Sequence, residues 1–214
     1  MAKARIDEVD YRGFPTVAKG MRSDAEKMNK EVIELYNTLK EMKKDWYGPR
    51  YDQLVKGFNK MIPDFDNMLK LTVTQVPASL EKIANNYAKV DIGAAITTAV
   101  EKATKKITNV ALSAKKTLRF EDSAVEAKKQ QMEKKLDEVN KLMNSIEAKY
   151  NKLNWKSDAS DEFKKTFKKL KTNIVKNTTA IKKDFKKLME QSATDMRKAE
   201  QANNVSKSVK KSVK

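Results

Sequence analysis

The sequence predicts an all-α protein in which two antiparallel helical hairpins pack as a four-helix bundle. Three observations lead to this prediction. The 214-residue chain has only five Gly and four Pro, too few for the many turns of a β-sandwich or barrel. Apolar residues recur every three or four positions over long stretches. Charged residues make up 35% of the chain and apolar residues 39%, a balance typical of amphipathic helices packed side by side.

The first hairpin is predicted over residues 1–91. Glycines and a proline indicate an irregular lead-in over residues 1–20. Ser23 is then a candidate N-cap, with a glutamate three places later, and it opens a helix whose apolar stripe ends at Trp46. The glycine-proline pair that follows Tyr47 stops this helix and opens the next one.

The second helix of this hairpin has apolar residues that alternate by four and three positions. They are Leu54, Phe58, Met61, Phe65 and Met68. This heptad-like spacing is typical of a helix that packs along another helix. Pro63 and Pro77 lie inside the same stretch, so we expect the helix to kink or break locally at each of them.

The second half of the chain predicts a connector, a second hairpin and a tail. Residues 92–123 are rich in Ala and Thr with apolar residues at helical spacing, so we expect a helical connector. A divergent hairpin follows over residues 124–203, with its turn at Trp155, and residues 204–214 form a basic flexible tail. A helical connector would span about 45–50 Å and run back along the bundle. We therefore expect the two tryptophans at opposite ends of the molecule.

An internal repeat relates the two hairpins. The two Trp residues coincide at a shift of 109 residues, and so do apolar residues of the helices that follow them: Leu54 with Phe163, Phe58 with Phe167, Met61 with Leu170, Phe65 with Ile174, and Val76 with Phe185. The apolar phases differ by about two residues before each tryptophan. The pattern indicates a duplication at the level of the fold and not a near-copy.

Composition argues against an enzyme. The chain has no Cys and no His, which removes thiolate metal sites, the commonest zinc ligand and the commonest general base. The glycines form no phosphate-binding loop. We therefore expect no catalytic residues, cofactor, metal or small-molecule substrate. No stretch approaches about 18 apolar residues, and the first residues lack the apolar core of a signal peptide, so we expect a chain without a transmembrane segment.

The positive charge is concentrated in the second half of the chain. The net charge is +17; residues 1–100 hold 16 basic and 14 acidic side chains, whereas residues 101–214 hold 30 and 15. An acidic partner, if there is one, should meet the second half. The last long helix carries the candidate basic face, formed by Lys164, Lys165, Lys168, Lys169, Lys182, Lys183, Lys186 and Lys187.

The motif order of the first hairpin resembles a known family. Trp46-Tyr47-Gly48 lies between two helices, and Tyr87 and Asp91 follow with the spacing Tyr-x-x-x-Asp. This arrangement is similar to the Trp-X-Gly proteins of the early-secreted-antigen, type VII secretion class. The resemblance implies that the Trp-X-Gly motif forms the hairpin turn and that Tyr87 and Asp91 form a secretion signal read by the secretion ATPase. It also implies pairing of two hairpins as an antiparallel four-helix bundle.

The second hairpin departs from the family pattern. Ser157 stands where Gly48 stands, and Met196 with Glu200 replaces the tyrosine and aspartate of the signal. The resemblance therefore implies a degenerate second signal in a monomer that mimics the family dimer. Such a protein would be secreted without a cleavable signal peptide, or remain cytoplasmic before export. It would act either as a secreted substrate or as an adaptor or chaperone for a co-secreted partner bound at the Tyr87 and Asp91 helix end.

A second hypothesis comes from the charge. A basic helical protein can bind nucleic acid through its phosphates, with an affinity that falls steeply as salt rises. It can also attach to an anionic membrane surface through amphipathic helices. Against nucleic acid, arginine is scarce and no helix-turn-helix, zinc-finger or aromatic-sheet motif is present.

Overall fold

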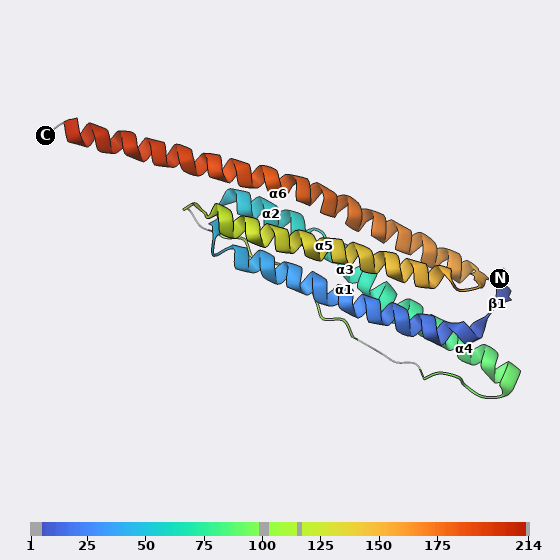
Figure 1. The fold of residues 1–214 in the computed structure, drawn as a ribbon. Coiled ribbons are helices and arrows are strands. Elements are labelled where there is room, and N and C mark those ends of the chain that lie inside the picture. Colours follow the sequence, from blue (N-terminus) through green and yellow to red (C-terminus); the bar gives the residue numbers. More distant parts are fainter. Residues whose placement is uncertain (1–5, 99–102, 115–116, 213–214) are drawn as a thin grey trace.

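The computed structural model describes residues 6–98, 103–114 and 117–212 (Figure 1). Within these residues the long helical arms are α1 (Phe14–Met42), a broken arm, α5 (Asp122–Asn151) and α6 (Asp158–Ser212). The broken arm consists of α2 (Pro49–Asn59), α3 (Ile62–Leu69), the π-helical segment η2 (Lys70–Gln75) and α4 (Val76–Ile92). The arms lie side by side and share one apolar core. The prediction of an all-α bundle of two hairpins is confirmed.

Helix α1 begins and ends earlier than its sequence suggests. It starts at Phe14, so the predicted N-cap at Ser23 is wrong and residues 14–20 of the expected irregular lead-in are helical. A proline in the first turn costs no hydrogen bond, and Phe14, Ala18 and Met21 extend the fully buried stripe backwards. The helix stops at Met42. Trp46 therefore lies beyond it, in the short strand β2 (Trp46–Tyr47).

The broken arm is interrupted before Pro63 and changes its helix type before Pro77. Pro63 lies in the first turn of α3 and Pro77 in the first turn of α4. A proline lacks the N–H that a helix interior needs, and the first turn is the position that tolerates this loss. The predicted local break is confirmed at Pro63. At Pro77 the helix does not break, because α3, η2 and α4 follow one another without a gap and the chain only changes from π-helical to α-helical geometry at Val76.

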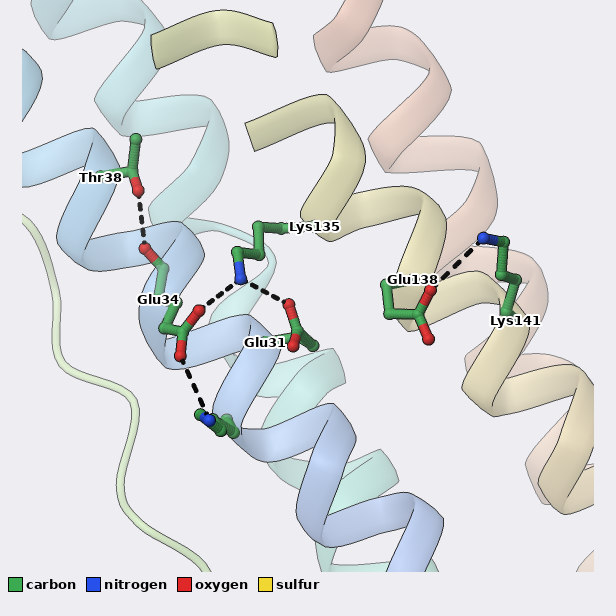
Figure 2. A network of polar contacts seen from close by, with 7 residues as sticks. Glu31, Glu34, Thr38, Lys135, Glu138 and Lys141 are labelled. Atoms are coloured by element: carbon green, nitrogen blue, oxygen red, sulfur yellow. Dashed lines mark hydrogen bonds and ion pairs between the residues drawn. The ribbon is translucent and has the colours of Figure 1, made fainter. Parts of the chain in front are cut away.

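Helices α1 and α5 pack in antiparallel order, and charged side chains line the edge of their contact, which we call the α1–α5 seam. Ion pairs cross this seam in sequence order: Asp45 with Lys128, Glu34 with Lys135, and Asp24 with Lys149. Figure 2 shows the middle of the seam, where Lys135 lies between Glu31 and Glu34. The residue numbers of the lysines on α5 increase as those of their acidic partners decrease. The two helices are therefore antiparallel, and the ion pairs fix the register of the two hairpins.

Helix α6 covers the broken arm, also in antiparallel order. Gly57 of α2 approaches the side chain of Ile181, and Arg50 at the start of α2 pairs with Asp195 at 3.5 Å. The apolar stripes related by the 109-residue shift are buried or partly buried in both hairpins. The strands also repeat: β2 precedes α2, and β4 (Trp155–Ser157) precedes α6. This correspondence fits a duplicated hairpin.

The described part of the connector between the hairpins is not helical, which corrects the sequence-based prediction. Residues 93–98 and 103–114 have no regular secondary structure, and the chain then enters strand β3 (Arg119–Phe120). The connector nevertheless runs back along the first hairpin, as expected (Figure 1). It meets Asn85, then Asn29, then Asn59. The apolar residues of the connector have helical spacing but do not form one buried helical face. Ile107 and Val110 are buried, whereas Ile96 is exposed.

Asparagine side chains of the helices hold the connector in place. Asn29 donates to the carbonyl of Lys105 and accepts from its N–H, both at 2.9 Å. Asn59 makes the same double contact with Val110, at 2.9 and 3.0 Å. A non-helical backbone needs partners for its polar groups when it lies against a core. These two side-chain amides supply them and thereby replace a helical hydrogen-bond ladder.

The last segment also differs from its prediction. Helix α6 continues through residues 204–212, which were expected to form a flexible tail. Figure 1 shows this end of α6 projecting beyond the other helices.

We expect Asn59→Leu to release the connector. The substitution keeps the branched shape of the side chain but leaves the N–H and carbonyl of Val110 without partners, which should cost about 1–3 kcal/mol of unfolding free energy. Urea unfolding and amide exchange at Val110 measure the effect. Asn67→Leu is the matched control, because Asn67 is exposed on α3. Unchanged protection of the Val110 amide would contradict the proposed clamp.

Candidate functional site: the two tryptophan turns

The turn of the first hairpin is an aromatic cluster built around Trp46. Strand β2 pairs with β3, which sets Trp46 opposite Phe120. The indole ring contacts Phe120 and Tyr51 edge-on, with centroids 5.6 and 6.1 Å away, and stacks on Phe185 of α6 at 5.9 Å. Its Nε1 donates to Ser192 Oγ at 3.0 Å. Trp46 thus joins the first hairpin to the second hairpin's last helix.

Gly48 is required at this turn by its backbone and its surroundings. Its φ is 124°, a region that favours glycine, and a Cβ here would lie 2.6 Å from Leu118 Cδ2. Gly48 occupies the N-cap position of α2, with Pro49 in the first turn. The residue therefore opens the second helix; it does not close the first.

A cavity of about 320 Å³ adjoins this turn. It is lined by Trp46, Gly48, Arg50, Leu118, Phe120 and Met196, among others. Met196 is the residue that the repeat aligns with Tyr87, so the counterpart of that tyrosine in the second hairpin lies next to the first tryptophan turn. Glu200, one helical turn further on, is exposed.

The second turn holds Trp155 in a similar but smaller cluster. The indole contacts Phe14 at 5.7 Å and Tyr150 at 6.2 Å between ring centroids. Strand β4 pairs with the N-terminal strand β1 (Ile6–Val9). Burial raises the pKa of Tyr150 to about 12, so its hydroxyl stays neutral and bonds to Ser160 Oγ at 2.9 Å.

Ser157 explains how the second turn manages without glycine. Its Oγ accepts the N–H of Ser160 at 3.1 Å, which makes Ser157 a side-chain cap for the start of α6. Among the described residues, Ala114 is the only non-glycine residue with positive φ, so Ser157 has an ordinary backbone. The second turn therefore does not require the positive φ angle that glycine provides at Gly48 in the first turn.

The Tyr87 and Asp91 pair is covered in part by the N-terminal segment. Tyr11, in the 3₁₀ turn η1 (Tyr11–Gly13), stacks on Tyr87 with centroids 5.9 Å apart. The Tyr11 hydroxyl donates to Asp91 Oδ2, and Arg12 Nη2 lies 3.1 Å from the same oxygen. The Tyr11 hydrogen bond, and then Arg12, hold the pKa of the Asp91 carboxyl below its usual value. These contacts could not be foreseen from a lead-in expected to be irregular.

The end of α4 exposes large apolar side chains beside this pair. Val90 is 90% exposed and Ile92 is 56% exposed, and they flank Asp91 in the sequence. Helix α4 then ends at Gly93, whose φ of 70° is the left-handed C-cap conformation. Half of the Asp91 side chain is also exposed. The Tyr87 and Asp91 helix end thus combines an acidic group with an uncovered apolar surface.

The basic face of α6 differs in membership from its prediction. Lys182 pairs with Asp137 of α5 at 2.6 Å and so does not belong to the free face. Lys176, which the prediction omitted, is exposed. Exposed positions on the same helix also include Lys164, Lys165, Lys168, Lys169, Lys183, Lys186 and Lys187.

Comparisons with known proteins identify no relative: no protein-family model matches the chain, and no curated protein or solved structure is significantly similar to it. Among the described residues, no helix is long and apolar enough to cross a membrane. In the same part of the chain, no cluster of three or more Asp and Glu residues is arranged to hold a metal ion.

Proposed function

We propose that this chain is a non-enzymatic protein of the type VII secretion class, and that it serves as a single-chain counterpart of the family's hairpin dimer. It would act as a secreted substrate, or as an adaptor for a co-secreted partner. Export would proceed without a cleavable signal peptide. The secretion ATPase or the co-secreted protein would dock at the Tyr87 and Asp91 helix end.

The observation that carries this proposal is the placement of the two tryptophan turns. Trp46 and Trp155 lie at opposite ends of α1, because Trp155 contacts Phe14 and Trp46 follows Met42. Each turn also lies near the second-helix end of the other hairpin. Trp46 shares a cavity with Met196, and the N-terminal segment links Trp155 to Tyr87. This is the antiparallel pairing that the family resemblance implies for two separate chains.

The exposed surface around Asp91 supports a docking role for this helix end. Large apolar side chains that stay in water are informative when they lie close to a candidate binding group. Val90 and Ile92 precede and follow Asp91 at the end of α4, and both lie outside the apolar core. A partner that covers the two apolar side chains and pairs with Asp91 would bury this surface.

We expect Tyr87→Ala and Asp91→Ala each to abolish export while the protein still accumulates in the cell. Removal of the aromatic ring or the carboxylate deprives the partner of its contact without opening the core, since Tyr87 is only half-buried and Asp91 half-exposed. Immunoblots of cells and medium, from a bacterium that carries a type VII apparatus, measure the effect.

Matched controls separate docking from stability. Val90→Ser should reduce export because it removes exposed apolar surface at the same helix end. Val175→Ser, a similar change at a 38% exposed valine on α6, should leave export unchanged. Circular dichroism should show equal helicity for all variants. Normal export of both the Tyr87 and the Asp91 variants would remove the signal from this proposal.

A further inference from the structure

The outward face of α6 carries a row of lysines directly opposite its buried face. We define the lysine stripe as Lys165, Lys168, Lys169, Lys176, Lys183, Lys186 and Lys187. Lys165, Lys176 and Lys183 recur at spacings close to whole numbers of helical turns, so they share one side of the helix. The opposite side carries Phe167 and Ile174, which are buried in the core.

Acidic residues of α6 border the ends of the stripe and are absent from its middle. Residues 163–183 contain no Asp or Glu, whereas Asp161 precedes Lys165 by four positions, and Asp184 and Glu190 lie near the last three lysines. The acids of α5 that reach α6 are engaged elsewhere: Glu147 pairs with Lys171 and Asp137 with Lys182. None of the stripe lysines makes an ion pair or a side-chain hydrogen bond within the described residues. Their positive charges are therefore free to pair with an anionic partner outside the chain.

The arrangement works against helix stability. Lys165 with Lys169, and Lys183 with Lys187, are like charges four residues apart. Such pairs repel each other and destabilise a helix, whereas an acid at either position would stabilise it. Other surfaces of the bundle do use acid–lysine pairs, as the α1–α5 seam shows (Figure 2). A polyanion laid along α6 would relieve this repulsion.

From this geometry we propose that the lysine stripe binds a nucleic acid through its phosphates, without reading its sequence. The stripe extends over about 33 Å, at about 1.5 Å per residue between Lys165 and Lys187. One turn of duplex DNA has about the same length. Lysine contacts phosphates as a point charge and needs no fixed fork geometry. The proposed function in secretion is not needed for this inference.

A nucleic acid fits the stripe better than a bilayer does. The outward face of α6 has no aromatic residue between the lysines, where Thr172 and Thr179 are exposed instead. A helix that lies on a membrane buries an apolar face in it, but the apolar face of α6 is already buried in the bundle. The stripe is also only one helix wide, and Asp137 of the neighbouring α5 keeps 58% of its side chain exposed.

The test compares two variants of the full chain with equal net charge. The stripe variant replaces Lys165, Lys169, Lys176, Lys183 and Lys187 by Gln. The control variant replaces exposed lysines of the first hairpin by Gln: Lys40, Lys56, Lys60, Lys70 and Lys89. Each variant loses five positive charges. Gln and Lys have similar helix propensities, so both variants should keep their helicity.

The probe is a fluorescein-labelled 20-bp duplex of mixed sequence, titrated by anisotropy between 50 and 200 mM NaCl. We expect the stripe variant to lose at least about tenfold in affinity at 50 mM, and its log–log salt slope to become shallower by up to about 4.5, at about 0.9 per lost phosphate contact. The control variant should stay within about threefold of the wild type. An unrelated duplex of the same length should bind equally well.

Three results would overturn the proposal. The first is an equal loss of affinity in both variants, which would mean that net charge alone governs binding. The second is no binding of the wild-type chain to DNA at 50 mM salt. The third is sedimentation of the wild type with vesicles of 30% phosphatidylserine at salt concentrations where it no longer binds DNA, because the stripe would then be a lipid surface.

Discussion

Replacing Arg22 by methionine should lower the free energy of unfolding by about 3–5 kcal/mol. Arg22 on α1 and Glu81 on α4 form an ion pair in which only 6% and 4% of the two side chains are exposed. Both carboxylate oxygens of Glu81 accept from the guanidinium, one of them at 2.7 Å, and Arg22 Nε donates to the carbonyl of Val73 at 3.2 Å. Methionine fills a similar volume but leaves Glu81 as a buried charge without its partner.

The double variant Arg22→Met/Glu81→Leu separates this explanation from a packing defect. Removing both charges also removes the desolvation cost, so the double variant should recover to within about 1–2 kcal/mol of the wild type. Urea unfolding followed by circular dichroism measures both variants. A double variant as unstable as Arg22→Met alone would contradict the electrostatic origin of the loss.

Lys141→Met provides the control for an exposed pair. Lys141 contacts Glu138 at 3.4 Å, and both side chains remain largely in water (Figure 2). Loss of a solvent-exposed pair of this kind should change stability by no more than about 0.5 kcal/mol. The contrast with Arg22 tests whether burial decides the effect.

The sequence predicted the helices best where one face of a helix meets one core. The stripe of Leu54, Phe58 and Phe65 is spaced for a helix and is buried as a helix. The start of α1 differs from the prediction because the glycines and the proline near Phe14 are typical helix breakers. Proline is tolerated in a first turn, and Gly20 lies inside α1, beside the side chain of Lys149.

The connector could not be predicted from local pattern, because its partners are remote in the sequence. Its apolar residues have helical spacing, and only Ile107 and Val110 of the described ones enter the core. The groups that hold its backbone are side chains of Asn29 and Asn59 on helices of the first hairpin. Asparagines beside an apolar helical stripe can indicate that a helix binds a non-helical segment. Their spacing in the sequence does not predict which segment it is.

The sequence predicts where the motif residues lie along the chain but not what they contact. Trp46 and Gly48 lie between α1 and α2, and a Trp-X-Gly pattern between two helices indicates this position. The docking of Trp46 on Ser192 and the stacking of Tyr11 on Tyr87 join residues far apart in the chain. Such contacts follow from how the hairpins pack, so no spacing within one helix predicts them.

Trp46→Ala should cost about 3–5 kcal/mol of unfolding free energy. The indole is 1% exposed and has ring contacts from three other elements, so its removal leaves a cavity that the surrounding helices cannot fill. Trp46→Phe should cost less, about 1–3 kcal/mol, because it keeps an aromatic ring and loses chiefly the hydrogen bond to Ser192. Chemical unfolding gives both values, and Trp155 remains as the fluorescence probe.

The same variant tests the arrangement of the two hairpins. Trp46 and Trp155 are separated by the length of α1, about 43 Å for 29 residues. Sites this far apart with no shared neighbour should contribute additively, so Trp46→Ala/Trp155→Ala should equal the sum of the single changes within about 0.5 kcal/mol. Trp46→Ala should also speed amide exchange at Glu121, whose N–H donates to the carbonyl of Asp45 at 2.9 Å, while leaving Ser160 protected, because the two amides lie at opposite turns. Strong coupling between the tryptophans, or loss of protection at both turns in an otherwise folded protein, would mean that the turns are adjacent and the hairpins parallel.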